Sequence, residues 1–200
     1  MSRVRADRIV NRAANGAVEL TEGATIPTGK TLSGAGAINI SGNITTSGTL
    51  TYEDVTNVDA VGIVTCGGGL TTKKMLKEEV NIVADKISNA NNIDLENGNV
   101  HLFTTNETGS TTPNLRYNAS TSLDSKMSVG ESIVLTIILQ ANSAGYLPNL
   151  TIGGGPNRTI SWVGGSAPSS GSSGIDITSY TIIKTAGDTF TIIGNLTQTA

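Results

Sequence analysis

The residues of this chain that come closest to a known chemical motif are 24–31, a segment ending in Gly-Lys-Thr. A phosphate-binding loop needs glycine at its first position, free backbone amides around the phosphate, and a helix directly after it. Here Ala24 stands first, Pro27 removes one amide, and residues 32–36 (Leu-Ser-Gly-Ala-Gly) are unsuited to a helix. We therefore expect no nucleotide site.

The sequence also lacks the sets of residues that other catalytic or metal sites need. The single histidine, His101, excludes a His-based metal cluster, and its place in an alternating segment predicts a side chain that points outward from a sheet. No serine lies in a Gly-x-Ser-x-Gly elbow. The adjacent acids Glu53-Asp54 and Glu78-Glu79 are explained by solvation, although a spatial pair for glycoside cleavage stays open. The oxygen-rich segment 89–98 lacks calcium-loop spacing and is typical of a turn. We expect no catalytic, cofactor or metal site.

Composition indicates a chain that cannot build a thick core by itself. Of its 200 residues, 14% are charged, 4% are aromatic and 24 are glycine. Disorder is disfavoured because the net charge is only -3 and β-branched residues recur throughout. Backbone ladders and contacts between subunits would then supply the missing burial. This predicts an obligate oligomer, and we expect a homotrimer.

Charge, cysteine content and the lengths of apolar segments limit which partners and compartment the chain can have. The sequence pI of about 5.1 argues against nucleic-acid binding. Basic residues do gather at the start, and we interpret the segment 1–20 as a particle-docking segment with these candidate residues: Arg3, Arg5, Arg8, Ile9 and Val10. The only cysteine, Cys66, excludes an internal disulfide framework, and we expect it to be a small buried apolar residue. No segment has the length of a signal core or membrane span, which predicts synthesis in the cytosol and no membrane insertion.

The first half of the chain predicts an irregular stalk. Short apolar pulses with strict alternation, such as Ile38/Ile40 and Leu50/Tyr52, are separated by glycine. Strands this short are not stable as an isolated sheet, but they are stable when wound with other chains. A regular solenoid is disfavoured because no fixed period recurs. We expect an intertwined β-stalk over residues 21–72.

A connecting region over residues 73–99 is expected to hold one short helix and two short strands. The helix is predicted over 73–80, where Thr71 or Thr72 could cap it and Met75, Leu76 and Val80 form a partial apolar stripe. Strands are predicted at 80–83 and 93–95.

The region 100–200 predicts an antiparallel β-sandwich of jelly-roll type, so the whole chain is expected to be all-β. Turn signals separate strands predicted at 100–103, 132–139, 147–152, 159–163, 175–183 and 189–193. Trp162, Tyr180 and Phe190 are its expected bulky core members. Residues 166–174 predict a flexible surface loop, either a connector or an outward contact surface. Its candidate contact residues are Ser166, Ala167, Pro168, Ser169 and Ser170.

Several segments resemble known proteins. Residues 50–65 (Leu-Thr-Tyr-Glu-Asp-Val-Thr-Asn-Val-Asp-Ala-Val-Gly-Ile-Val-Thr) resemble a segment repeated in virion structural and tail-fibre-like proteins of contractile-tailed phages that infect marine cyanobacteria. A domain that closes such proteins is similar to four further segments: 92–105, 129–132, 162–168 and 180–186. The resemblance implies a particle component and carries no catalytic motif with it.

These observations lead to one hypothesis and two alternatives. The hypothesis is a non-enzymatic virion structural protein, a homotrimeric short fibre or spike that mediates attachment or assembly. Its expected partners are itself, other virion proteins of tail, neck, baseplate or capsid, and a host surface glycan or protein. One alternative is a capsid decoration or cement protein. The other is a polysaccharide-degrading tail spike, disfavoured because the chain has one tryptophan and four tyrosines for sugar stacking.

Overall fold

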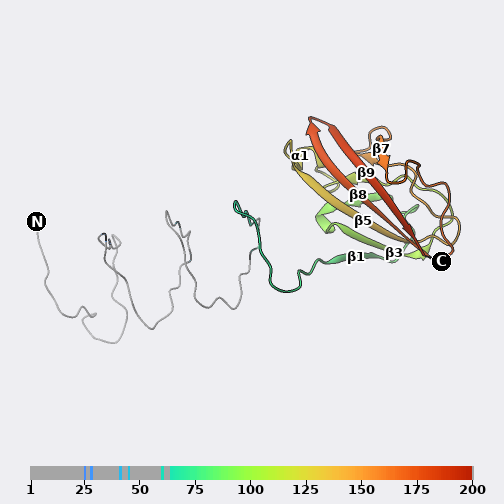
Figure 1. The fold of residues 1–200 in the computed structure, drawn as a ribbon, viewed down its shortest axis with the longest axis horizontal. Helices are drawn as coiled ribbons and strands as arrows, with labels where there is room; N and C mark the ends of the chain where they lie inside the picture. The colour runs from blue at the N-terminus through green and yellow to red at the C-terminus, as the bar shows by residue number, and fades with distance from the viewer. Residues whose placement is uncertain are drawn as a thin grey trace, which may run out of the picture. The chain divides into compact units, whose positions relative to one another are not determined.

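The computed structural model describes residues 64–199 together with Thr25, Thr28, Ser41, Thr45 and Ala60. The chain divides between Thr65 and Cys66, and almost everything described belongs to the second unit (Figure 1). The predicted stalk and the predicted docking segment lie outside the described residues, apart from those isolated positions and residues 64–72.

The described region is mostly strand. The strands are β1 (Val80–Val83), β2 (Asn92–Asp94), β3 (Val100–Asn106), β4 (Asn114–Arg116), β5 (Ser132–Gln140), β6 (Thr151–Ile152), β7 (Ile160–Trp162), β8 (Ile175–Ala186) and β9 (Thr189–Gln198). Two short helices interrupt them, the 3-10 helix η1 (Leu95–Asn97) and α1 (Leu123–Lys126). This confirms the prediction of an all-β chain for the described region. Within it, neither helix is long and apolar enough to cross a membrane.

The chain winds back and forth between two sheets. The six-stranded sheet has the order β1-β3-β5-β8-β9-β7, and the three-stranded sheet has the order β2-β4-β6. From β1 to β6, consecutive strands therefore alternate between the sheets. Within each sheet these strands are parallel and in register, so that Val80 pairs with Val100 and Asn114 pairs with Thr151. Parallel neighbours need a crossover connection, and here each crossover is a strand of the other sheet.

The C-terminal strands complete the six-stranded sheet in a different way. β8 and β9 form an antiparallel hairpin, and β8 also pairs antiparallel with β5 (Figure 1). The short β7 then pairs parallel with β9. The prediction of an antiparallel sandwich is therefore wrong in strand direction, because most strand pairs among the described residues are parallel. The two-sheet arrangement itself agrees with a sandwich-like fold.

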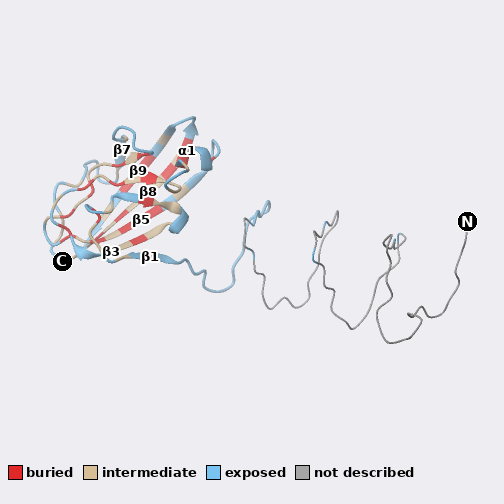
Figure 2. Cartoon of the chain, turned by 180° about the vertical axis from the view of Figure 1, so that it is seen from behind, coloured by how far each residue is buried: buried red, intermediate tan, exposed pale blue. Residues whose placement is uncertain are grey.

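One core lies between the two sheets. It includes Ile93, Leu115 and Ile152 of the three-stranded sheet, which are paired in register, and Leu135, Ile137, Leu139 and Ile182 of the six-stranded sheet. Figure 2 shows buried segments alternating with partly exposed ones along β5, β8 and β9. Successive side chains of a strand point to opposite faces, so each of these strands has one core side.

The three aromatic residues expected in the core differ in depth. Tyr180 is fully buried, whereas Trp162 and Phe190 are half-buried and pack against the core. The rings of Trp162 and Tyr180 meet edge to face with centroids 5.9 Å apart. Burial raises the pKa of the Tyr180 hydroxyl, because the charged phenolate would lie away from water.

Three local predictions are corrected by the structure. Residues 73–79 form no helix and are exposed throughout. An isolated helix of this length is marginal in water, and here nothing buries its apolar stripe. The β-domain also begins at Val80 rather than at residue 100, since β1 pairs with β3. Of the strand predicted at 147–152, only Thr151–Ile152 is strand.

Candidate functional site

The site residues predicted from sequence fall partly outside the described residues. Arg3, Arg5, Arg8, Ile9 and Val10 lie outside the described residues, as do the phosphate-loop-like segment, except Thr25 and Thr28, and the pair Glu53-Asp54. Cys66 is exposed, which corrects its predicted burial, because it lies in a segment without packing partners before β1. Glu78 and Glu79 line an open hollow of about 610 Å³ beside β1. No cluster suited to a metal ion occurs among the described residues.

The loop of residues 166–174 lies on the surface and contains no strand. Ser166, Ala167, Ser169 and Ser170 are exposed, and Pro168 is half-buried. The second half of the loop is fixed, because the backbone amide of Ser143 donates to the carbonyl of Ser172, and that of Ala141 donates to the carbonyl of Gly174. Its role as a contact surface stays a prediction.

His101 points into the domain, so the prediction that it points outward is wrong. It is 1% exposed and lies on the same side of β3 as the buried Phe103. Its Nε2 donates to the carbonyl of Gly98 at 3.0 Å, while its Nδ1 lies 3.0 Å from Asn81 Nδ2 and accepts from that amide. Burial lowers the pKa of His101, because desolvation disfavours the charged ring. This histidine is a paired structural residue rather than a base facing a substrate.

The two buried carboxylates of the domain are also satisfied by local donors. Glu107 is 1% exposed and accepts from the backbone amides of Ser88 and Thr108 and from the Ser88 hydroxyl. Asp176 is fully buried and accepts from the backbone amide of Ser172 and from Gln198 Nε2. A buried carboxylate with several donors stabilises the loops that supply them. Neither carboxylate lines the hollow beside β1.

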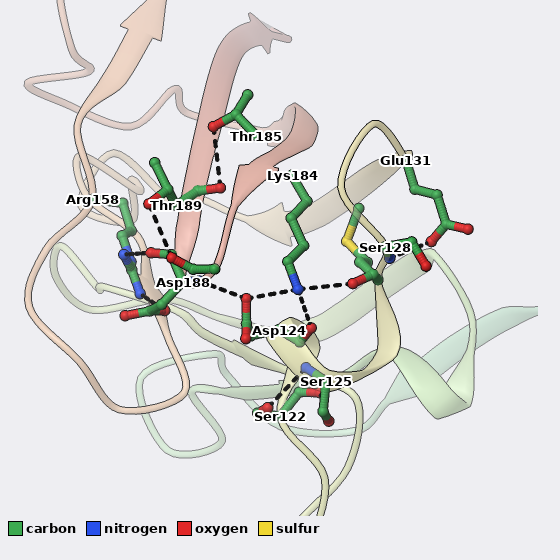
Figure 3. A network of polar contacts seen from close by, with 12 residues as sticks. Ser122, Asp124, Ser125, Ser128, Glu131, Arg158, Lys184, Thr185, Asp188 and Thr189 are labelled. Atoms are coloured by element: carbon green, nitrogen blue, oxygen red, sulfur yellow. Dashed lines mark hydrogen bonds and ion pairs between the residues drawn. The ribbon is translucent and has the colours of Figure 1, made fainter.

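Figure 3 shows a network of polar contacts around Lys184, and these contacts also have a structural purpose. The Lys184 ammonium, nearly buried on β8, donates to the carbonyls of Asp124 and Met127 and lies 2.9 Å from Asp124 Oδ1. These contacts use all three of its protons. Hydrogen bonding from Lys184 lowers the pKa of the Asp124 carboxyl, with a further contribution from the Asp188 amide. The network fastens α1 to the β8–β9 hairpin.

The outer face of the six-stranded sheet differs from these clusters because no residue on it is charged. The core-facing positions alternate with outward positions along β1, β3, β5, β8 and β9, and the register aligns the outward positions in rows across the strands. The outward residues are Val80, Ile82, Val100, Leu102, Ser132, Val134, Thr136, Ile138, Gln140, Ile175, Ile177, Ser179, Thr181, Ile183, Thr191, Ile193, Asn195 and Thr197. We call this set the uncharged face.

Large apolar side chains on the uncharged face are open to solvent. Ile82 is 66% exposed, Val134 55% and Ile193 40%. One row, Ile82-Leu102-Ile138-Ile177, is apolar across four neighbouring strands. Charged residues are common on the surfaces of soluble domains, and their depletion is the compositional mark of an interface core. The arrangement can therefore bury apolar area against a partner.

Sequence reasoning missed the uncharged face, although part of its signal is visible. A strand was predicted at 175–183, and the residues Ile175, Ile177, Ser179, Thr181 and Ile183 on its outward side contain no charge. Pairing with β5 and β9, which only the fold provides, turns this short pattern into a surface.

Comparison of the chain with protein-family models, with curated proteins and with solved structures finds no match.

Proposed function

We propose that this chain is a non-enzymatic structural protein of a phage particle that assembles as a homotrimer through the uncharged face of its β-domain. The observation that carries the proposal is this face, which is free of charge over five neighbouring strands and exposes large apolar side chains. The resemblance of residues 50–65 and of the C-terminal segments to virion and tail-fibre-like proteins supports the assignment to a particle.

The chemistry of the face favours another copy of the same chain as its partner. Three copies of a face without charge can turn toward a common threefold axis without like-charge repulsion, and their Ile, Val and Thr side chains can pack there as they do between packed sheets. The face also presents about as many residues as the roughly 20 per side of a standard protein interface. As a short fibre or spike component, such a trimer multiplies weak contacts to a host surface or to other virion proteins.

Light scattering coupled to size-exclusion chromatography of the full chain tests the proposal. We expect the purified protein to have a mass three times the 20.5 kDa of one chain. Ile138→Lys places a charge in the apolar row and should convert the trimer to folded monomers with an unchanged circular dichroism spectrum. Ser128→Lys, on an exposed loop off the face, serves as the matched control and should stay trimeric.

Each contrary outcome leads to a different reading. If Ile138→Lys stays trimeric, the uncharged face does not hold the copies together. If the wild-type chain is a monomer that binds only to assembled capsids, the decoration-protein alternative replaces the fibre. Loss of host polysaccharide on incubation with the purified chain would contradict the non-enzymatic assignment. Electron cryomicroscopy of the particle would place the protein on head or tail.

A further inference from the structure

A hollow of about 400 Å³ lies on the other side of the domain, over the outer side of the three-stranded sheet. β4 contributes Asn114 and Arg116, the turn that follows β4 contributes residues 118–122, and the turn after β6 contributes Gly153 and Gly154. We call this hollow the polar groove. The only charged side chain that lines it is that of Arg116; the others are amides, hydroxyls, one alanine and the two glycines.

The polar groups of the groove are held in fixed orientations. Asn114 Nδ2 donates to Asn92 Oδ1, and Asn114 Oδ1 accepts from Thr151 Oγ1 and from the backbone amide of Gly154. Asn118 Nδ2 donates to Glu96 Oε1, and Asn118 Oδ1 accepts from the backbone amide of Ser120. A site whose groups are already ordered loses little conformational entropy when a ligand binds.

The charge of Arg116 is compensated within the domain. Its Nε donates to Asp94 Oδ1 at 2.5 Å, and its Nη2 donates to Asp94 Oδ2 at 3.2 Å. These bonds use two of the five guanidinium protons, so the others can still donate. With Asp94 alongside, the groove offers donors without a net positive charge. This favours a neutral ligand rich in hydroxyl groups over a phosphate or a sulfate.

The glycine turn keeps one side of the groove open. Gly153 and Gly154 have φ values of 65° and 73°, in the left-handed region that glycine adopts without strain. A Cβ added at either position would meet no atom within 4 Å, so the space beyond the turn is free. A chain-like ligand could therefore extend out of the groove across the turn.

We propose that the polar groove binds a neutral oligosaccharide. Sugar hydroxyls both donate and accept, which matches a surface of amides, hydroxyls and guanidinium protons. The inference rests on the proposed function in one respect: the uncharged face and the polar groove lie on opposite sides of the core, so the groove stays open when copies pack through the uncharged face.

An array of immobilised oligosaccharides probed with the full-length protein tests the inference, with neutral hexose and N-acetylhexosamine chains beside uronic-acid and sulfated chains. We expect binding to a subset of the neutral chains. Ser120→Arg fills the groove at an exposed residue whose side chain makes no hydrogen bond within the described part of the chain, and it should weaken binding at least about tenfold. Ser128→Arg, outside the groove, should leave binding unchanged.

The oligomeric state is measured on the same samples, which separates the two proposals. Absence of binding to every neutral chain by an intact trimer overturns the groove inference and leaves the proposed function standing. Equal binding by Ser120→Arg and wild type also overturns it, since the sugar then binds elsewhere. Preference for sulfated or uronic-acid chains contradicts the charge argument and overturns the neutral ligand class. A monomeric wild type contradicts the proposed assembly, whatever the array shows.

Discussion

The outer sides of the two sheets carry different side chains at paired positions. On the six-stranded sheet, Ile82, Leu102 and Ile138 lie next to one another in register. On the three-stranded sheet, the corresponding row is Asn92, Asn114 and Thr151. The amide and hydroxyl groups of the second row bond to each other. The apolar side chains of the first row have no hydrogen-bonding groups, so contact with water does not stabilise them. The two sides of one core therefore differ: the polar groups of the three-stranded sheet already bond to each other, whereas the exposed apolar area of the six-stranded sheet gains free energy only when a partner covers it.

The first way to test this comparison is to damage the shared core from each side. Leu115 lies under the polar face and Leu135 under the uncharged one, and both are fully buried. Leu115→Ala and Leu135→Ala should each lower the free energy of unfolding by about 3 kcal/mol, through lost burial and a cavity. Urea unfolding followed by tryptophan fluorescence measures this. Two separate transitions, or a loss confined to one variant, would show that the two sheets do not unfold as one unit.

A second test cuts the connection between the two sides. Lys184, on β8 of the six-stranded sheet, donates to the carbonyl of Asp124 in α1 and to that of Met127, which caps the end of α1. The turn that lines the polar groove leads directly into α1. Lys184→Met leaves these two carbonyls without their donor and should cost about 2 kcal/mol. Lys126→Met is the control, because Lys126 is exposed and takes no part in this network; it loses only a cation–π contact with Tyr117, so its cost should be smaller. Equal thermal stability of Lys184→Met and wild type would contradict a structural role for the network.

A third test compares hydrogen bonds on the two faces directly. Asn114 makes close bonds to its neighbours, whereas the Thr136 and Ser179 hydroxyls on the uncharged face lie 3.4 Å apart. Asn114→Ala should lower the unfolding free energy by about 1 kcal/mol, and Ser179→Ala by less, because a long bond contributes little. Chemical denaturation gives both values. A larger loss for Ser179→Ala would reverse the contrast between the faces.

The smallest expected effect concerns His101, which lies inside the domain between the two faces. Burial lowers its pKa below the ordinary value of 6.5, so the unfolded chain takes up the proton first as pH falls. Stability is therefore retained above about pH 6.5 and decreases below it, until the pH reaches the lowered pKa of the folded state. From about pH 7.5 to about pH 6.0 this contribution is at most about 0.8 kcal/mol.

The matched variant for this measurement is His101→Gln, which keeps a polar side chain without a titrating ring. The difference in unfolding free energy between wild type and His101→Gln should depend on pH in the stated direction. If the difference stays constant from about pH 7.5 to about pH 6.0, or if wild type gains stability relative to the variant as pH falls, the burial argument is wrong.

Local patterns were enough to predict much of the strand content. Runs rich in Ile, Val and Thr at 132–139 and 175–183, bounded by turn signals, predicted β5 and β8, because β-branched side chains favour the extended backbone. The serine- and glycine-rich residues 166–174 were predicted as a surface loop for an equally local reason. β4 was missed, since its three residues include one apolar side chain, and its pairing is supported by side-chain bonds to Asn92 and Asp94 in another strand.

The all-β character and the lack of a recognisable catalytic or nucleotide motif follow from the sequence by itself, because both depend on residue types and short spacings. Strand direction, the inward position of His101 and the two outer faces were decided only by the tertiary structure. Alternation separates the two sides of a strand without telling which side meets the core. The uncharged face needs five strands in register, and the polar groove needs β4 next to the turn after β6. Such pairings join residues far apart in the chain, and no local pattern contains them.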